Sequence, residues 1–295
     1  MAEGLIIKGV GGLYSVESNK RIYDCRVRGV FRKRGITPLP GDFVEFTVTN
    51  DEMGEGWVEE IKERKNFFVR PPVANVNMMA IVISVNSPEP DFLLVDKLLI
   101  SAQKNDIEPV IIINKTDLAD NTSHSQIEEI YKGTAFTIIP MSKITKEGYD
   151  ILYTKLEGRI TVFAGQSGVG KSTILNNIID SWVMETGEIS DKIQRGRHTT
   201  RHVQLLPLIS GGYVVDTPGF SSFSLDGVEY DKLSWMYPEF EKLQEQCRFN
   251  GCSHVSEPEC SVKNAVSAGE ISLIRYNCYS KLFEELKEQY DKRYK

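Results

Sequence analysis

The chain has 295 residues, of which 41% are hydrophobic and 26% are charged, as in ordinary soluble globular proteins. Its length favours two or three domains, and its net charge of −6 argues against a protein that is basic throughout. No apolar run approaches the ~20 residues of a membrane span, and the first residues do not resemble a signal peptide. We therefore expect a cytoplasmic protein without membrane contact, whose five cysteines stay reduced.

Residues 1–70 predict a small β-barrel of the oligonucleotide-binding (OB) type. Short β-branched and aromatic stretches such as "GLIIKGVGGLYSV" and "DFVEFTV" alternate with turn residues, a spacing that suits this barrel. Residues 20–34 carry seven Lys or Arg and one Asp, which suits contact with RNA phosphates. Tyr23 and Phe31 either stack on bases or pack inside the barrel, and packing is the more common role of strand aromatics. Residues 69–76, "VRPPVANV", are expected to be a linker.

Residues 71–225 predict a doubly wound α/β domain. The apolar runs "MMAIVISV", "PVIIIN", "AFTIIP", "ITVFA" and "GYVVDTPG" are typical of buried parallel strands, and helical stretches lie between several of them. One such helix is expected within residues 91–105, with Asp91 as its N-cap. Residues 226–295 are expected to be mainly helical, with a cluster of Cys and His.

The stretch "GQSGVGKST", residues 165–173, follows a predicted strand and precedes a predicted helix, as a phosphate-binding loop does. Its glycines allow backbone N–H groups to face phosphate oxygens at the positive end of the helix dipole. Lys171 is expected to reach the β- and γ-phosphates, and the Ser172 hydroxyl is expected to bind Mg²⁺.

Other loops add a guanine-binding pattern. "NKTD", residues 114–117, follows a buried strand, and the Asp117 carboxylate can accept hydrogen bonds from two guanine donors that adenine lacks. Ser142, after the next strand, is expected to support the base. Asp216 in "DTPG" is expected to hold Mg²⁺ through water. In "GRHTTR" Thr200 is favoured over Thr199 as a Mg²⁺ ligand, although a solvated basic loop is the alternative.

The predicted GTP contacts come from four places: the base-reading loop (residues 114–117), the loop that contains Ser142, the phosphate loop (residues 165–173) and one glycine of "DTPG". They are Asn114, Lys115, Thr116, Asp117, Ser142, Gly165, Gln166, Ser167, Gly168, Val169, Gly170, Lys171, Ser172, Thr173 and Gly219. The predicted magnesium ligands are Ser172, Thr200 and Asp216, and Lys171 and Thr200 are also assigned to catalysis. Phe220 occupies the position where many switch GTPases have a water-orienting Gln. His198 is the nearest candidate for that task, and contact with rRNA phosphate is its equally weighted alternative.

In an ordinary GTPase the phosphate loop precedes the base-reading loop, whereas here it follows. A cut between "DTPG" and "NKTD", with the old termini joined, produces the observed order, and domain termini often lie close enough to be joined. We therefore expect a circularly permuted GTPase domain.

The permuted motifs, the barrel and the terminal cluster "CRFNGCSHVSEPEC" together resemble the bacterial ribosome-small-subunit-dependent GTPases of the RsgA (YjeQ/YloQ) family. The resemblance covers essentially the whole chain. It implies an OB-fold barrel, a permuted P-loop GTPase domain, a C-terminal zinc domain and a role in late maturation of the small (30S) ribosomal subunit. The implied partners are that subunit, its rRNA and GTP or GDP, and we expect the protein to be a monomer.

Cys247, Cys252, His254 and Cys260 predict one structural Zn²⁺, because four such ligands within fourteen residues suit tetrahedral coordination. Unrelated residues or a disulfide are the alternatives. Cys278 falls on an apolar helical stripe with Ile274 and Leu282, and it is expected to be core, as is Cys25.

Two other functions remain open. One is a metabolic ATP- or GTP-dependent enzyme, for which the sequence shows no acid/base constellation. The other is a zinc-stabilised RNA-binding module with a largely structural nucleotide site, against which the intact Lys171, Ser172 and Asp216 argue.

Overall fold

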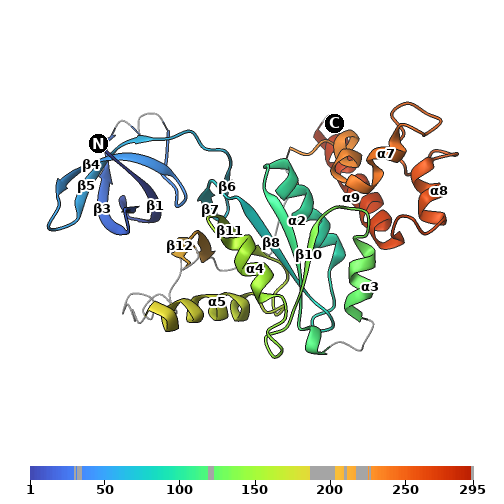
Figure 1. Cartoon of the computed structure of the whole chain (residues 1–295). Coiled ribbons are helices and arrows are strands. Elements are labelled where there is room, and N and C mark those ends of the chain that lie inside the picture. The colour runs from blue at the N-terminus through green and yellow to red at the C-terminus, as the bar shows by residue number, and fades with distance from the viewer. Residues whose placement is uncertain are drawn as a thin grey trace.

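The computed structural model describes residues 1–29, 31, 35–118, 123–186, 203–208, 211–216, 225 and 227–293, except for the side chains of 123, 180–186 and 216. Figure 1 shows a barrel at the N-terminal end, a central sheet flanked by helices and a group of helices at the C-terminal end. None of the described helices is long and apolar enough to cross a membrane.

Five strands form the N-terminal barrel: β1 (Ala2–Val10), β2 (Leu13–Ser18), β3 (Arg21–Val27), β4 (Phe43–Asn50) and β5 (Glu55–Ile61). They pair in the order β1-β2-β3-β5-β4, and β4 pairs with β1 to close the barrel. Alternate side chains fill its interior, as the period of two in a strand requires. Phe31 is buried there, and the Tyr23 ring lies 5.2 Å from that of Phe46, so packing accounts for both aromatics.

The segment after the barrel is not a plain linker, which corrects the expectation for residues 69–76. Strands β6 (Phe67–Val69) and β7 (Pro72–Ala74) form a short hairpin instead. Val73 and Ala74 are buried, and the Ala74 N–H donates to the carbonyl of Pro40. The hairpin therefore fastens the end of the barrel to the next domain.

The central sheet has the order β10-β9-β8-β11-β13-β12. Its strands are β8 (Met78–Ser84), β9 (Glu108–Asn114), β10 (Thr137–Met141), β11 (Ile160–Ala164), β12 (Gln204–Pro207) and β13 (Tyr213–Asp216). All neighbours are parallel except β12 and β13, and β12 also pairs with β1 through Lys8 and Gln204. The five parallel strands were expected from the sequence, but β12 was not.

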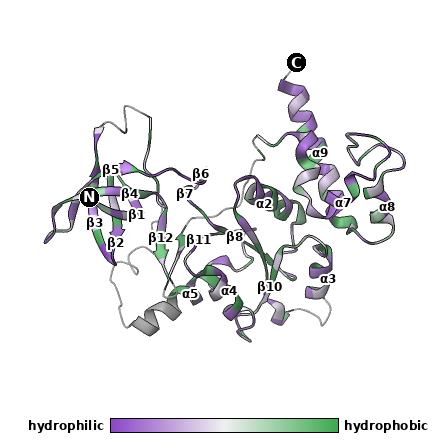
Figure 2. Ribbon diagram, turned by 45° about the horizontal axis from the view of Figure 1, so that its top comes forward, coloured by the Kyte–Doolittle hydropathy of each residue, from purple (hydrophilic) through white to green (hydrophobic). Residues whose placement is uncertain are grey.

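Both faces of this sheet are covered, which explains the continuous apolar runs. Alternate β8 residues such as Ile81 pack on one face against α2 (Phe92–Lys104) and α3 (Ser123–Ile130). Their neighbours, such as Val82, pack on the other face against α4 (Tyr149–Leu156) and α5 (Lys171–Thr186). Figure 2 shows the resulting apolar colouring along the central strands. Asp91 caps α2 as expected, because its Oδ1 accepts from the Leu94 N–H at 3.0 Å.

The C-terminal part is mainly helical. It contains the 3₁₀ helices η2 (Tyr230–Met236) and η3 (Pro238–Phe240), and the α-helices α7 (Glu241–Gln244), α8 (Ser261–Ser267) and α9 (Leu273–Arg293). Ile100 of α2 lies in its core, so α2 packs on the sheet and on this domain. Cys278 and Leu282 are buried as expected, whereas Ile274 is 39% exposed and lies outside the core of this domain.

Candidate nucleotide site and metal centre

The phosphate loop lies between β11 and α5. Gly165 has a φ of +130°, and a Cβ at this position would lie 2.1 Å from the carbonyl oxygen of Val82, so only glycine fits beside β8. The loop ends at Lys171, where α5 begins with its unpaired N–H groups directed back towards the loop. A backbone of this form suits an anion such as a phosphate.

The Lys171 ammonium lies inside this loop. Its Nζ donates to the carbonyls of Gly165 at 2.8 Å and Gln166 at 2.6 Å. Burial lowers the pKa of Lys171, because desolvation disfavours its charged form. A phosphate beside Nζ would restore the preference for the charged form, so anion binding and protonation of Lys171 favour one another.

Two of the three predicted magnesium ligands lie near the phosphate loop in the described part of the chain. Ser172 is in the first turn of α5, and Asp216 ends β13, which pairs in parallel with β11. A hydroxyl and a carboxylate are oxygen donors of the kind that Mg²⁺ prefers, so the residue types fit the ion that accompanies GTP. Bound there, Mg²⁺ would neutralise the negative charge that develops on the phosphates during hydrolysis.

The base-reading loop follows β9 and meets the loop after β10. The two strands pair in parallel with Asn114 opposite Met141, so Asp117 and Ser142 leave the sheet at the same edge. The buried Ser142 hydroxyl donates to Oδ1 of Asp117 at 2.6 Å and accepts from the Ile144 N–H at 3.1 Å. The exposed Asp117 carboxylate is thereby held in one orientation, which suits recognition of a base edge.

Direct contacts join the base-reading loop to the phosphate loop. Nδ2 of Asn114 donates to the Val169 carbonyl at 2.8 Å, and Nζ of Lys115 donates to that of Gly168 at 2.9 Å. Gly170 makes the approach possible, because a Cβ there would lie 2.2 Å from Nδ2 of Asn114. Two loops whose order is reversed along the chain are therefore adjacent in space.

Two further contributors were missed in the sequence. The segment after β8 passes beside the site, where the Ser87 carbonyl accepts from Lys115 and the Asn86 amide donates to the Leu118 carbonyl at 3.1 Å. The sequence offered one signal for this segment, since it follows a buried parallel strand and ligands bind at the carboxyl ends of such strands. Glu147 accepts from the Thr116 hydroxyl at 2.9 Å, and no local pattern marks this contact.

Several predicted site residues lie outside the part of the chain that the structure describes. They are His198, Thr199, Thr200, Gly219 and Phe220, and the side chain of Asp216 is likewise outside it. Their assigned roles therefore stay predictions. Gln166, Ser167 and Thr173 lie in the phosphate loop or in the first turn of α5.

The four predicted zinc ligands converge in the C-terminal domain. The ligand atoms of Cys247, Cys252, His254 and Cys260 all lie within 4.8 Å of one another. Sγ of Cys247 lies 3.9 Å from Sγ of Cys260 and 3.6 Å from Nδ1 of His254. Tetrahedral zinc with bonds of ~2.3 Å to sulfur and ~2.1 Å to nitrogen requires separations of about 3.8 and 3.6 Å. The donor set therefore fits one Zn²⁺, and all five cysteines of the chain are free thiols.

Residues behind the ligands hold this cluster in shape. The Tyr276 hydroxyl donates to the His254 carbonyl at 2.8 Å, and the Tyr279 hydroxyl donates to that of Ser253 at 2.6 Å. Burial lowers the pKa of His254, which favours the neutral imidazole that a metal needs. Four protein ligands leave no open coordination position, so the expected role of the metal is structural.

A phosphate loop, an adjoining guanine-type loop and the reversed chain order define a circularly permuted P-loop GTP-binding protein. Comparison with known proteins supports this class. The family model for the RsgA GTPase matches residues 61–226, and the family model for the RsgA N-terminal domain matches residues 3–58. The chain belongs to the RsgA GTPase family and is a GTP-hydrolysing enzyme.

Individual relatives match over almost the whole chain. The small ribosomal subunit biogenesis GTPase RsgA of Ruminiclostridium cellulolyticum is 49% identical over 98% of this chain and 95% of its own length. The RsgA GTPase of Geobacillus thermodenitrificans is 47% identical over 98% of this chain and 99% of its own length. Among solved structures, the circularly permuted GTPase YloQ has a TM-score of 0.81 at 37% identity and covers 98% of this chain and 96% of its own. YjeQ from Thermotoga maritima has a TM-score of 0.79 at 38% identity, with coverages of 97% and 98%.

Proposed function

We propose that this GTPase acts in biogenesis of the small (30S) ribosomal subunit, binds that subunit through its rRNA and hydrolyses GTP faster when bound. The names of its relatives support a role in this process, since these relatives are called small ribosomal subunit biogenesis GTPases. The proposal assigns barrel, GTPase and zinc domains to residues 1–70, 71–225 and 226–295, a monomeric state and a cytoplasmic location. The GTP, magnesium, zinc and catalytic residues predicted from the sequence are part of the same proposal.

The contact between Asn114 and Val169 carries the nucleotide part of the proposal, because it joins the base-reading and phosphate loops. A nucleotide that lies across both loops is read at the base and held at the phosphates. The order of the loops in the chain does not matter to a ligand that contacts only their positions in space.

Hydrolysis by purified protein with GTP and Mg²⁺ is the test, measured alone, with small subunits and with large subunits. We expect a slow rate alone, because Phe220 has no hydrogen-bonding group to orient water. Small subunits should raise the rate strongly and large subunits should not. A rate that is equally high without ribosomes, or equally stimulated by large subunits, would contradict the proposal.

A further inference from the structure

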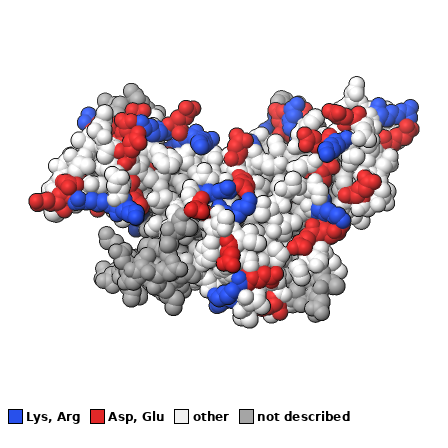
Figure 3. Space-filling view, in the orientation of Figure 1, with Lys and Arg blue, Asp and Glu red and all other residues white. Residues whose placement is uncertain are grey.

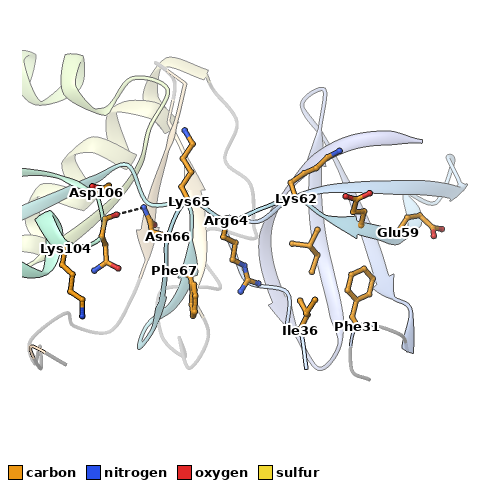
Figure 4. Close-up of a pocket in the computed structure, with 13 residues that line it drawn as sticks. Phe31, Ile36, Glu59, Lys62, Arg64, Lys65, Asn66, Phe67, Lys104 and Asp106 are labelled. Carbon is orange, nitrogen blue, oxygen red and sulfur yellow. Dashed lines mark hydrogen bonds between the residues drawn. The ribbon is translucent and has the colours of Figure 1, made fainter. Parts of the chain in front are cut away.

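A groove lies where the barrel meets the GTPase domain, away from the nucleotide site and the zinc cluster. Its volume is about 790 Å³, and its lining comes from the barrel, from the segment that leads into β6 and from the end of α2. We call this cavity the junction groove. Figure 4 shows Phe67 between Lys104 and Arg64, with the three side chains directed to the same side, and Ile36 and Phe31 further along on the barrel.

Two apolar side chains of the junction groove are exposed to solvent. Phe67 is 51% exposed and Ile36 is 40% exposed. The Arg64 guanidinium carbon lies 5.5 Å from the centroid of the Phe67 ring. An exposed aromatic ring beside an arginine is a combination on which nucleobases stack.

The backbone that carries Phe67 is firmly held. Arg64 donates to both carboxylate oxygens of Asp42, at 2.7 and 2.8 Å, and the Lys65 N–H donates to Oδ1 of Asn75 at 2.9 Å. Asn66 donates to the Val76 carbonyl at 2.9 Å and accepts from the Val76 N–H at 2.9 Å. The backbone at Phe67 is thus held in place before any ligand arrives, which reduces the entropy cost of binding.

The junction groove carries charges of both signs. Four cationic residues and three carboxylates line it: Lys62, Arg64, Lys65, Lys104, Glu59, Glu60 and Asp106. Glu59 is paired with Arg28 at 2.8 Å, while Arg64 is paired with Asp42 at 2.7 Å and Lys62 is paired with Glu45. On the face seen in Figure 3, Lys and Arg are mixed with Asp and Glu rather than gathered into a broad basic surface. Recognition at this groove therefore depends on local contacts.

We propose that the junction groove binds an unpaired stretch of RNA, with one base stacked on Phe67 and the adjoining phosphates near Lys104 and Arg64. The proposal deepens the proposed function and rests on it, since rRNA would supply the strand. A cavity of this volume is in the range that holds a ligand of about one or two nucleotides. Only unpaired nucleotides offer a free base face, because the bases of a duplex are stacked on one another.

The test is fluorescence anisotropy with a labelled, unstructured RNA octamer and the full-length, zinc-loaded protein. Phe67→Leu should weaken binding by about fivefold to 160-fold, the range of one lost base–aromatic stack, and Phe67→Trp should retain it. Phe43→Leu is the matched control, because Phe43 is 50% exposed but does not line the groove. Unchanged affinity in Phe67→Leu, or an equal loss in Phe43→Leu, would overturn the proposal.

Two competitors and one assay define the ligand. Unlabelled octamer should displace the labelled strand, whereas a duplex of the same sequence and a free mononucleotide should not, and efficient displacement by either would overturn the assignment to unpaired RNA. Binding of each variant to small subunits then separates this inference from the proposed function. Weaker subunit binding in Phe67→Leu than in Phe43→Leu supports the groove. Equal subunit binding by both variants refutes the groove alone, and failure of the unaltered protein to bind subunits refutes the proposed function.

Discussion

Replacement of Arg275 by methionine should detach the C-terminal domain from α2. Arg275 on α9 is 2% exposed, and its guanidinium bonds to Asp96 of α2, which is fully buried, and to Glu239 of η3 at 2.8 Å. The guanidinium also lies 4.4 Å from the ring centroid of Tyr237, whose hydroxyl donates to Asp96 at 2.8 Å. Loss of one partner of a buried ion pair costs about 3–5 kcal/mol, because a charge is left uncompensated.

Hydrogen exchange of the α9 amides at several urea concentrations measures this cost as a local opening free energy. Lys97→Met is the control, because the ion pair of Lys97 with Glu285 joins the same two helices but is 24% and 37% exposed. A partly exposed pair contributes about 0–1 kcal/mol, so the control should lose far less than Arg275→Met. Equal losses in the two variants would refute the reasoning from burial.

The loss in Arg275→Met should also depend on pH. Burial, opposed by Arg275, raises the pKa of Asp96 to about 6, and removal of the cation raises it further. The unfolded value is ~3.9, so the folded variant binds more protons, and its stability falls as pH rises from about 4 through the raised pKa. The destabilisation should therefore be larger at pH 8 than at pH 5. An identical loss at both values would show that Asp96 does not titrate in this environment.

Four further changes test the nucleotide and metal sites. Asp117→Asn should weaken GTP binding about 10- to 100-fold and improve binding of xanthosine triphosphate, and unchanged GTP affinity in a titration would remove Asp117 from the base pocket. Gly170→Ala should lose more GTP affinity than Gly168→Ala. Both glycines have a positive φ, but only a Cβ at Gly170 clashes with the base-reading loop, so equal losses would mean that backbone strain alone weakens binding. Cys252→Ser should lower the zinc content below one per chain and unfold the C-terminal domain first, and full zinc content would contradict its role as a ligand. His198→Ala should retain GTP binding but lose most of the rate stimulated by small subunits, whereas full stimulation would assign water positioning elsewhere.

The parallel sheet and both loops were predictable because their signals are local. Strands buried on both faces give unbroken apolar runs, such as that of β8, and the phosphate loop needs its glycines at fixed spacing. The strand β12 has only four residues and joins the barrel through one pairing with β1, so no period reveals it. The β6–β7 hairpin was hidden by its prolines, which are typical of linkers as well as of edge strands.

Contacts between residues far apart in the chain could not be predicted from the sequence for a different reason. Arg275 and Asp96 are 179 residues apart, and each is an ordinary surface residue by type. Both become buried because each supplies the opposite charge that the other needs, and that pairing exists only in the folded chain. Glu147 illustrates the same limit at the nucleotide site, where its contact with Thr116 spans 31 residues.

The helix α2 links the nucleotide site to the C-terminal domain. Oε1 of Gln166 in the phosphate loop accepts from the backbone N–H of Asp91 at 3.1 Å, and Asp91 caps α2. Further along the same helix, Asp96 bonds to Arg275 of α9. Permutation adds a second attachment, because the chain after β13 leads directly into the C-terminal domain. The C-terminal domain is thus connected to the nucleotide site twice, once by the chain that follows β13 and once by the buried charges on α2.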